Sequence, residues 1–363
     1  MDKNKKILVG IIAVILALVG GYFLYKAYGR RPAKQINING NQANSGPANT
    51  GPVSPISGLP CENWNRRPFA VMQPADITAR PAAGFSDADM VIEMPVITAS
   101  ITRLMSVYVC GNPDDVGSMR SSRHDYIALA KGLDAIFVHW GGSHFAKEKL
   151  NEGVIDNMNC NSDGGKSAGQ YCYRKEETGT MRGVDTGYAK FAKLLEGAKD
   201  FGYRLENKFS GYPHQDETPL DQRPNGGHLR VAFAGPYAAE YDYNKETNSY
   251  LRTWGGKEDT DRNNGKGIAP KNIAVIIAAS EQIEGQYNNV QIGDPWYDST
   301  DSGEAHYYMN GQEFSGTWKK DKSSLSSKLF FYDGNGQEIK FVPGQIWLEV
   351  LEPGQNLRWT PAA

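Results

Sequence analysis

An uncharged apolar run near the N-terminus constrains this chain more than any other feature. The run ILVGIIAVILALVGGYFLY, residues 7–25, follows the basic stretch MDKNKK. At 1.5 Å of rise per residue, a helix of this length is about long enough to cross the hydrocarbon core of a bilayer. The sequence therefore predicts an N-terminal tail and one transmembrane helix within residues 1–31. A cleaved signal peptide is the alternative, although Lys26 lies awkwardly between the apolar run and the small-residue site at AYG.

The next segment has the composition of a tether. Residues 32–59 read PAKQININGNQANSGPANTGPVSPISGL, which is poor in large apolar side chains and rich in Asn, Gly, Pro and Ser. Such a segment cannot bury enough apolar surface to form a core. We expect a flexible linker here. Basic residues flank both ends of the apolar run, so charge alone does not decide the orientation in the membrane.

The cysteines favour an oxidising compartment. Cys61, Cys110, Cys160 and Cys172 are even in number and lack the C-x-x-C spacing of a zinc ribbon. Cys160 and Cys172 bound the loop CNSDGGKSAGQYC and can pair with each other, which leaves Cys61 for Cys110. Four buried free thiols are the alternative. On balance we expect two disulfides and a globular part outside the cytoplasm.

The remaining chain divides into two segments by pattern. Residues 60–224 alternate short apolar runs with helical stretches such as RHDYIALAKGL, which predicts an α/β domain: a mixed sheet with flanking helices and a Gly- and Cys-rich insertion. The run DAIFVH suits a strand covered on both faces, and residues 186–205 form an amphipathic helical pattern. Residues 225–363 contain strand-like runs joined by turns such as Asn310-Gly311, which predicts a mostly β domain with a small antiparallel sheet or barrel.

Three carboxylates can share one strand face in SDADMVIEM. If residues 87–94 form a strand, Asp87, Asp89 and Glu93 point the same way, because side chains alternate along a strand. They could bind a cation, supply a general acid or pair with arginines. We prefer the interpretation in which both aspartates lie in a turn. Glu93 is then buried and must be neutralised by an arginine such as Arg103.

A histidine and two glycines follow the predicted strand in DAIFVHWGGSHF. His139 ends this strand, Gly141 and Gly142 permit close approach, and Ser143 is placed to cap the next helix. The carboxyl ends of strands are where open α/β sheets bind ligands. A structural histidine beside a tight turn is an equally good interpretation. No G-x-S-x-G nucleophile motif occurs in the chain.

The stretch GSMRSSRHDY brings two arginines to a helix start. Ser122 followed three residues later by Asp125 predicts a capping box, and Ser121 lies beside it. Arg120 and Arg123 are unfavourable at the positive end of the helix dipole. We therefore expect them, with Arg103, to face either a carboxylate such as Glu93 or an anionic ligand.

The order of these motifs resembles a known family. RPFAVM, ARPAAGFSDADMVIEM, ITRLMSVYV and DVGSMRSSRHDYIALAKGLDAIFVHWGGS resemble, in order and spacing, the YerB-like family of bacterial envelope lipoproteins, a domain of unknown function. The resemblance extends through NGQEFSGTWKK and GNGQEIKFVPGQIWLEV. It implies a membrane-attached, extracytoplasmic protein with two distinct parts. The motif residues that carry over are Arg80, Asp89, Glu93, Arg103, Arg120, Ser121, Arg123, His139 and Gly142.

Two departures from this family stand out. The family is anchored through a lipidated cysteine near the N-terminus, whereas no cysteine precedes Cys61 here, so a protein helix must replace the lipid. The family also carries a His-Asn pair before the long helix, where this chain has Val184 and Asp185. If that pair belongs to a site, the site is altered in this chain.

Three functions are compatible with these features, and binding ranks above catalysis. The first is binding of a cell-wall glycan, an anionic polymer or an envelope protein through Arg103, Arg120, Ser121, Arg123 and the residues around His139. The second is an envelope-glycan hydrolase or lyase with Glu93 or Asp89 as acid and His139 as base. The third is a scaffold for envelope enzymes. We expect no cofactor or metal, and the net charge of −2 gives no general attraction to nucleic acid.

Overall fold

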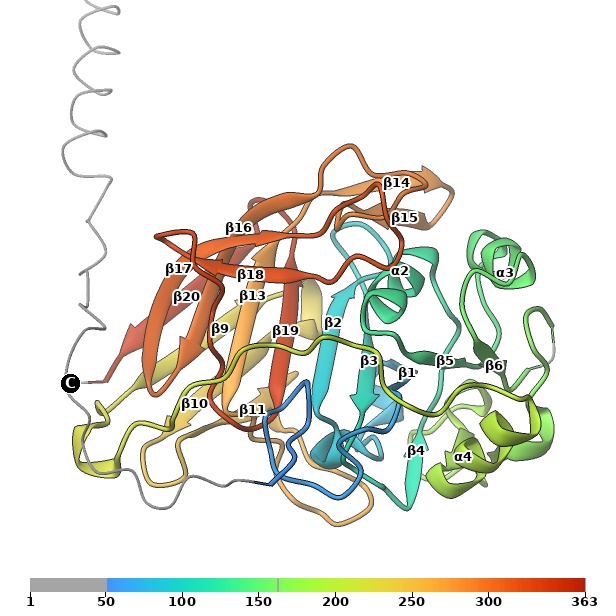
Figure 1. The fold of residues 1–363 in the computed structure, drawn as a ribbon, viewed down its shortest axis with the longest axis horizontal. Coiled ribbons are helices and arrows are strands. Elements are labelled where there is room, and N and C mark those ends of the chain that lie inside the picture. Colours follow the sequence, from blue (N-terminus) through green and yellow to red (C-terminus); the bar gives the residue numbers. More distant parts are fainter. Residues whose placement is uncertain (1–50, 162, 363) are drawn as a thin grey trace, which may run out of the picture. The chain divides into compact units, whose positions relative to one another are not determined.

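The computed structural model describes residues 51–161 and 163–362 (Figure 1). The predicted transmembrane helix, residues 7–25, lies outside these described residues, as does most of the predicted linker. Within the part of the chain that the structure describes, no helix is both long and apolar enough to span a membrane.

A ten-stranded mixed sheet forms the centre of the protein (Figure 1). In spatial order its strands are β18 (Phe330–Asp333), β17 (Gln312–Lys319), β16 (Ser302–Met309), β13 (Asn272–Ile277), β19 (Ile346–Leu351), β2 (Met90–Pro95), β3 (Thr102–Tyr108), β1 (Phe69–Pro74), β5 (Ile136–His139) and β6 (Asn157–Asn159). Strands β13, β19 and β2 are parallel, as are β1, β5 and β6. Strands β2 and β19 are buried along their whole length, as expected for interior parallel strands.

The smaller sheets surround this centre. They comprise a five-stranded sheet of β12 (Lys257–Glu258), β11 (Ser249–Trp254), β10 (Ala239–Asn244), β9 (Gly227–Ala232) and β20 (Asn356–Pro361), a three-stranded sheet of β4 (Asp115–Gly117), β8 (Gly187–Lys190) and β7 (Tyr173–Arg174), and a hairpin of β14 (Ser280–Glu284) and β15 (Tyr287–Val290). Because β19 and β2 are neighbours, the predicted segments 60–224 and 225–363 share one sheet. The C-terminal strands only partly form a sheet of their own, since β13 and β16 to β19 extend the central one.

The helices in the described part of the chain are few and short. The α-helices of the described residues are α2 (His124–Gly132), α3 (His144–Asn151) and α4 (Phe191–Asp200). The 3-10 turns are η1 (Ile77–Ala79), η2 (Phe85–Asp87), η3 (Gly169–Tyr171), η4 (Gly183–Asp185), η5 (Leu220–Gln222) and η6 (Gly235–Tyr237). The helical pattern predicted for residues 186–205 was too long, because residues 187–190 pair with β4 and β7 as strand β8.

Two cores lie on the two faces of the central sheet. Met94 and Met105 point into the core shared with α2 and α3. Val91 and Leu104 point into the core shared with α4 and the five-stranded sheet. The mixed sheet with flanking helices is therefore confirmed, although the described chain as a whole is mostly β.

Both predicted disulfides are present. Cys61 pairs with Cys110 and Cys160 pairs with Cys172. Among the described residues no cysteine is free. These bonds fit a protein that folds in an oxidising compartment.

Candidate functional site

Glu93 lies in a buried cluster of charges between the two large sheets. Its side chain points, with that of Val91, toward the five-stranded sheet and is fully buried. Nη2 of Arg252, on β11, donates to Oε2 of Glu93 at 2.5 Å, and the hydroxyl of Thr102 donates to Oε1 at 2.6 Å. An arginine thus neutralises Glu93, but it is Arg252 and not Arg103. Arg103 pairs with Met94 across the strands and so lies on the opposite face.

Arg80, Asp259 and Glu349 complete this buried charge cluster. Asp259 accepts from Arg252 and, at 3.2 Å, from Arg80 Nη1. Glu349 accepts from the hydroxyl of Tyr241, while its Oε2 is buried without a hydrogen-bond partner among the described residues. Burial and then the charge of Glu93 raise the pKa of Glu349 to about 8. Burial also raises the pKa of Glu93. If the pair of Glu93 and Glu349 holds one proton at neutral pH, two arginines face two carboxylates and the charges balance.

Sequence reasoning missed Arg252, although a signal was present. In SYLRTW every second residue lies on one face of β11, and the three on the inward face, Tyr250, Arg252 and Trp254, are all buried. An arginine between two large aromatic residues on an inward face indicates a buried charge that needs partners.

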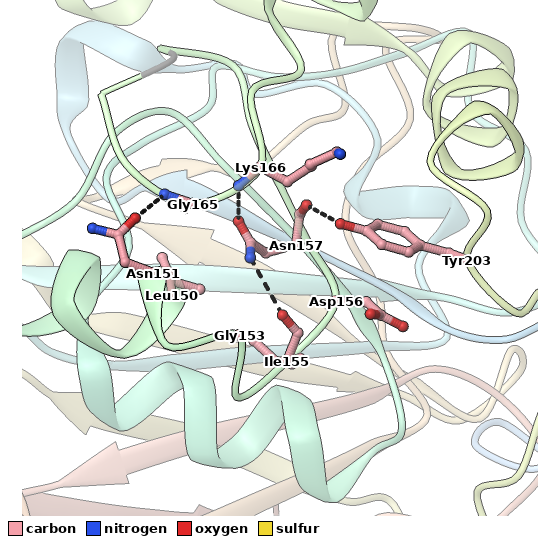
Figure 2. A pocket seen from close by; sticks show the side chains of 9 residues that line it. All are labelled: Leu150, Asn151, Gly153, Ile155, Asp156, Asn157, Gly165, Lys166 and Tyr203. Atoms are coloured by element: carbon pink, nitrogen blue, oxygen red, sulfur yellow. Dashed lines mark hydrogen bonds between the residues drawn. The ribbon is translucent and has the colours of Figure 1, made fainter.

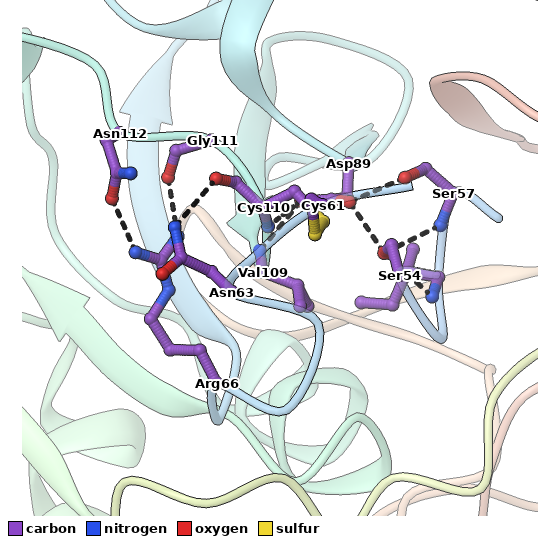
Figure 3. The surroundings of a disulfide bond; sticks show 11 residues. Ser54, Ser57, Cys61, Asn63, Arg66, Asp89, Val109, Cys110, Gly111 and Asn112 are labelled. Carbon is purple, nitrogen blue, oxygen red and sulfur yellow. Dashed lines mark hydrogen bonds between the residues drawn. A yellow bond between two sulfur atoms is a disulfide. The ribbon is translucent and has the colours of Figure 1, made fainter. Parts of the chain in front are cut away.

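Asp89 anchors the N-terminal segment (Figure 3). It lies just before β2, in the turn as predicted, yet it is buried. The hydroxyls of Ser54 and Ser57 donate to its Oδ1 at 2.7 and 2.6 Å. The backbone N–H groups of Val109 and Cys110 donate to its Oδ2 at 2.7 and 2.9 Å. Both carboxylate oxygens are therefore engaged in holding the chain.

This anchoring corrects the predicted end of the linker. Residues 51–59 were predicted to be part of the flexible tether, but Ile56 is fully buried in the core. The hydroxyls that bind Asp89 and the nearby Cys61–Cys110 disulfide fasten this segment to the domain (Figure 3). The small polar residues that suggested a linker serve here as hydrogen-bond donors.

His139 is a buried residue at the carboxyl end of β5. Its Nδ1 lies 2.8 Å from the carbonyl oxygen of Gly141 and its Nε2 lies 3.4 Å from Oδ1 of Asn157. Burial lowers the pKa of His139, so the ring is neutral at neutral pH. Ser143 caps α3 as predicted, because its hydroxyl accepts from the N–H of Ala146 at 3.2 Å. Gly142 packs so closely on Ser122 that a Cβ would lie 2.5 Å from the hydroxyl oxygen.

The three catalytic candidates lie apart. Strands β3 and β1 separate β5 from β2, which places His139 about 14 Å from the strand of Glu93 at the usual strand spacing. The side chains of Glu93 and His139 also point to opposite faces of the sheet. Asp89 lies just before the first residue of β2, where it binds Ser54 and Ser57. These residues form no acid–base pair around a shared space.

The arginines of ITRLM and MRSSRH do come together, beside the carboxyl ends of strands β1 and β5. Arg103 Nη1 donates to the carbonyl oxygen of Ser121 at 2.7 Å, and Arg123 Nη1 donates to that of Ser122 at 3.1 Å. Burial and then the charges of Arg123 and Arg120 lower the pKa of Arg103, so the three positive charges are close enough to repel one another. Guanidinium groups nevertheless stay charged in proteins. We call Arg103, Arg120 and Arg123 the arginine edge.

The predicted capping box is absent. The N-cap residue of α2 is Arg123, which makes no side-chain cap. The hydroxyl of Ser122 instead donates to the carbonyl oxygen of Gly141 at 3.2 Å. Asp125 accepts from the N–H of Tyr126 and, at 3.3 Å, from that of Val290 on the hairpin. Ser122 and Asp125 are taken by tertiary contacts that no local sequence pattern specifies.

Arg120 has carboxylate partners within the protein. Its Nη2 lies 2.9 Å from Oδ2 of Asp76 and 2.5 Å from Oδ1 of Asp185. Arg182 contacts the same two aspartates at 3.2 and 2.9 Å. Asp185 is fully buried, and the arginines help to hold its pKa below the usual range against the opposing effect of burial. The anion that faces Arg120 is therefore internal.

Arg103 and Arg123 differ from Arg120. Neither has a carboxylate within 4 Å among the residues that the structure describes. Their Nε atoms are buried without a hydrogen-bond acceptor there, as is that of Arg120. Arg123 lies over the ring of Tyr287 at 5.5 Å from its centroid. The nearby Asp125 is already engaged by backbone N–H groups, and burial raises its pKa. The arginine edge therefore carries uncompensated positive charge.

Two shallow pockets lie elsewhere. One, of about 280 Å³, is lined by residues around Asn157, which accepts from the backbone N–H of Lys166 and donates to the carbonyl oxygen of Ile155 (Figure 2). The other, of about 410 Å³, lies at the start of α4 beside Lys190 and Phe191. Neither contains a residue of the arginine edge. Within the described ranges, no group of three or more His, Cys, Asp and Glu side chains is placed to hold a metal ion.

Comparisons with known proteins place this architecture in a family. Residues 56–204 match "Protein of unknown function (DUF3048) N-terminal domain" and residues 229–348 match its "C-terminal domain". The "Putative lipoprotein YerB" of Bacillus subtilis is 29% identical over 305 residues, which are 82% of this chain and 86% of that protein. The chain belongs to the YerB-like family. The crystal structure of YerB protein from Bacillus subtilis matches with a TM-score of 0.70 and 26% identity, over 82% of this chain and 96% of that one.

Within this YerB-like chain, the motif residues divide into two groups. Asp89, Glu93 and His139 each have buried partners in the protein, as does Arg80. Arg103 and Arg123 keep unmatched charge. Asp185, at the position of the departure noted in the sequence, has a structural role, because it is the carboxylate nearest to Arg120. Sequence reasoning did not identify Asp76 or Asp185 as partners of the arginines.

Proposed function

We propose that this protein is attached to the cell membrane with its globular part outside the cytoplasm, and that it binds an anionic ligand of the cell envelope at Arg103 and Arg123. The lipoprotein name of its relative and the two disulfides support the location. The predicted helix in residues 7–25 would provide the attachment as a single-pass anchor. A wall glycan with acidic groups or another anionic polymer is the class of ligand that fits these charges.

One observation carries this proposal. Two neighbouring, half-buried guanidinium groups lack a carboxylate in the described residues, while the other arginine of the edge has two. Placing like charges together without a counter-charge costs free energy. An external anion that binds both would remove this cost.

The catalytic alternative has less support. A hydrolase or lyase would need Glu93 or Asp89 to act with His139 on one substrate. Glu93 binds Arg252 and Thr102, Asp89 accepts four hydrogen bonds, and His139 contacts Gly141 and Asn157. A scaffold for an envelope protein remains compatible with the arginine edge, since a partner could supply the acidic group.

The binding proposal is tested with inorganic polyphosphate as the anionic probe. Purified full-length protein in detergent should bind it with an affinity that falls as salt rises, because the contact is ionic. Arg103→Gln and Arg123→Gln should each weaken binding about tenfold, the loss expected for one charged hydrogen-bonding group. Arg358→Gln, at an exposed arginine on β20, is the matched control and should bind as the wild type does. Absence of binding by the wild type, or equal binding by all four proteins, would reject the proposal.

The attachment is tested separately. The full chain should stay in the membrane fraction after an alkaline carbonate wash, since a spanning helix resists conditions that release peripheral proteins. Deletion of residues 1–31 should release it into the soluble fraction. Release of the intact chain by the wash would contradict a transmembrane anchor.

A further inference from the structure

A group of aromatic side chains borders the arginine edge. His144 and Phe145 come from the first turn of α3, Tyr287 from β15 and Tyr297 from the loop that follows. The ring of Phe145 lies 4.1 Å from that of His144, 5.9 Å from that of Tyr287 and 5.9 Å from that of Tyr297, measured between centroids. We call these four residues the aromatic platform.

The aromatic platform is open to solvent. Tyr297 is 39% exposed, the side chain of His144 is 50% exposed, and Phe145 and Tyr287 are half-buried. Contiguous exposed aromatic groups on a soluble domain commonly mark a binding surface. The platform is also continuous with the arginine edge, because the guanidinium of Arg123 lies over Tyr287.

We infer that the ligand is an acidic polysaccharide, with its charged groups on Arg103 and Arg123 and a neighbouring sugar ring stacked on Tyr297. This inference rests on the anion binding proposed above and narrows the class of ligand from any anionic polymer to a saccharide. A sugar ring has a face of C–H groups and a rim of hydroxyls. Tyrosine side chains suit both parts, since they combine a flat apolar ring with a polar tip. Carboxylate or phosphate substituents on the same chain match the guanidinium groups.

The surroundings of the platform favour an acidic polysaccharide as the ligand over nucleic acid and over a protein. Within the described residues, the large aliphatic side chains most exposed to solvent, such as Ile77 and Val184, lie outside the platform, so it offers aromatic rings rather than a mixed apolar surface. Nucleic acid also combines rings with anions. The disulfides, however, indicate an oxidising compartment, where glycans and not nucleic acids are the abundant polymers. Carboxylates also border the platform: that of Glu284 lies 3.2 Å from His144 Nε2, and that of Asp294 accepts from the backbone N–H of Tyr297 at 2.9 Å.

The test compares two polyanions, one with sugar rings and one without. Full-length protein is titrated with polygalacturonate, a uronic acid polymer, and with inorganic polyphosphate, and single-stranded DNA is titrated as a further control. Tyr297→Leu should weaken binding of polygalacturonate about fivefold to tenfold, as expected for the loss of one stacking ring, and leave polyphosphate binding unchanged. Tyr297→Phe keeps the ring and should retain most of the affinity. Tyr332→Leu, at a half-buried aromatic residue on β18 at the far end of the sheet, is the matched control.

The outcomes separate this inference from the proposal beneath it. If polyphosphate binds through Arg123 but Tyr297→Leu leaves polygalacturonate binding intact, anion binding stands and the saccharide assignment is overturned. An equal loss of single-stranded DNA binding in Tyr297→Leu would also overturn it, because the platform would then stack rings of any kind. If the wild type binds neither polyanion, the proposed function itself fails.

Discussion

Two groups of arginines in this protein differ in how their charges are balanced. In the buried charge cluster, Arg80 and Arg252 face Glu93 and Asp259, with Glu349 beside them. At the arginine edge, only Arg120 has carboxylate partners among the residues that the structure describes. Arg252 and Glu93 are fully buried, and such charges must be matched within the protein, whereas a charge nearer the surface can be matched by a ligand. The comparison suggests that the first group maintains the fold and the second is available for binding.

The largest effect should come from breaking the buried cluster. Arg252→Met leaves Glu93 and Asp259 buried without their main counter-charge, which should destabilise the protein by about 3–5 kcal/mol. The free energy of unfolding, measured by urea denaturation, checks this. Arg358→Met, at an exposed arginine of the same five-stranded sheet, should change it by less than about 0.5 kcal/mol. A similar small change for Arg252→Met would mean that this cluster does not maintain the fold.

The second prediction concerns how Glu349 makes the free energy of unfolding depend on pH. Burial and the charge of Glu93 raise its pKa to about 8 in the folded protein, whereas the unfolded value is near 4.5. Between these values the folded state holds a proton that the unfolded state has lost, so Glu349 makes stability fall as pH rises from about 4.5 to 8 and adds no further change above that. This contribution is at most about 1.4 kcal/mol per pH unit.

Glu349→Gln should remove this dependence. The amide is similar in shape to the protonated carboxyl and does not titrate, so the difference in unfolding free energy between variant and wild type should grow in favour of the variant as pH rises from 5 to 8. Urea denaturation at several pH values measures it. A constant difference across this range would show that Glu349 is ionised in the folded protein or that another group holds the proton.

The sequence predicts which charges must be partnered better than it predicts their partners. The pattern of MVIEM indicated that Glu93 is buried beside an arginine, and this was correct because alternation along a strand is local. The identity of Arg252 was not predictable in this way, since it lies 159 residues away and meets Glu93 only when two sheets pack. Ser122 and Asp125 fit a local capping box, yet in the structure they form hydrogen bonds with Gly141 and Val290 instead. Whether Arg103 and Arg123 meet a carboxylate also depends on tertiary packing and not on the local sequence.

A smaller effect is expected within the arginine edge at Arg120. Arg120→Gln leaves the buried Asp185 with Arg182 and Thr78 as partners, so the loss should be partial, about 2 kcal/mol in the free energy of unfolding. Arg182→Gln, at the more exposed partner of the same carboxylate, should cost less. If Arg120→Gln were neutral, the contrast between Arg120 and its two neighbours would disappear.

The smallest effect on stability, and the sharpest test of the comparison, is expected at Arg123. Arg123→Gln loses one hydrogen bond to the carbonyl oxygen of Ser122 and the contact with Tyr287, but it also relieves the repulsion of Arg103. These contributions oppose each other, so the free energy of unfolding should change by no more than about 0.5 kcal/mol, even though anion binding falls about tenfold. A residue that maintains the fold would lose stability and binding together. A loss of stability as large as that of Arg120→Gln would mean that Arg123 has an internal partner after all, and the arginine edge would then be a second structural cluster rather than a binding surface.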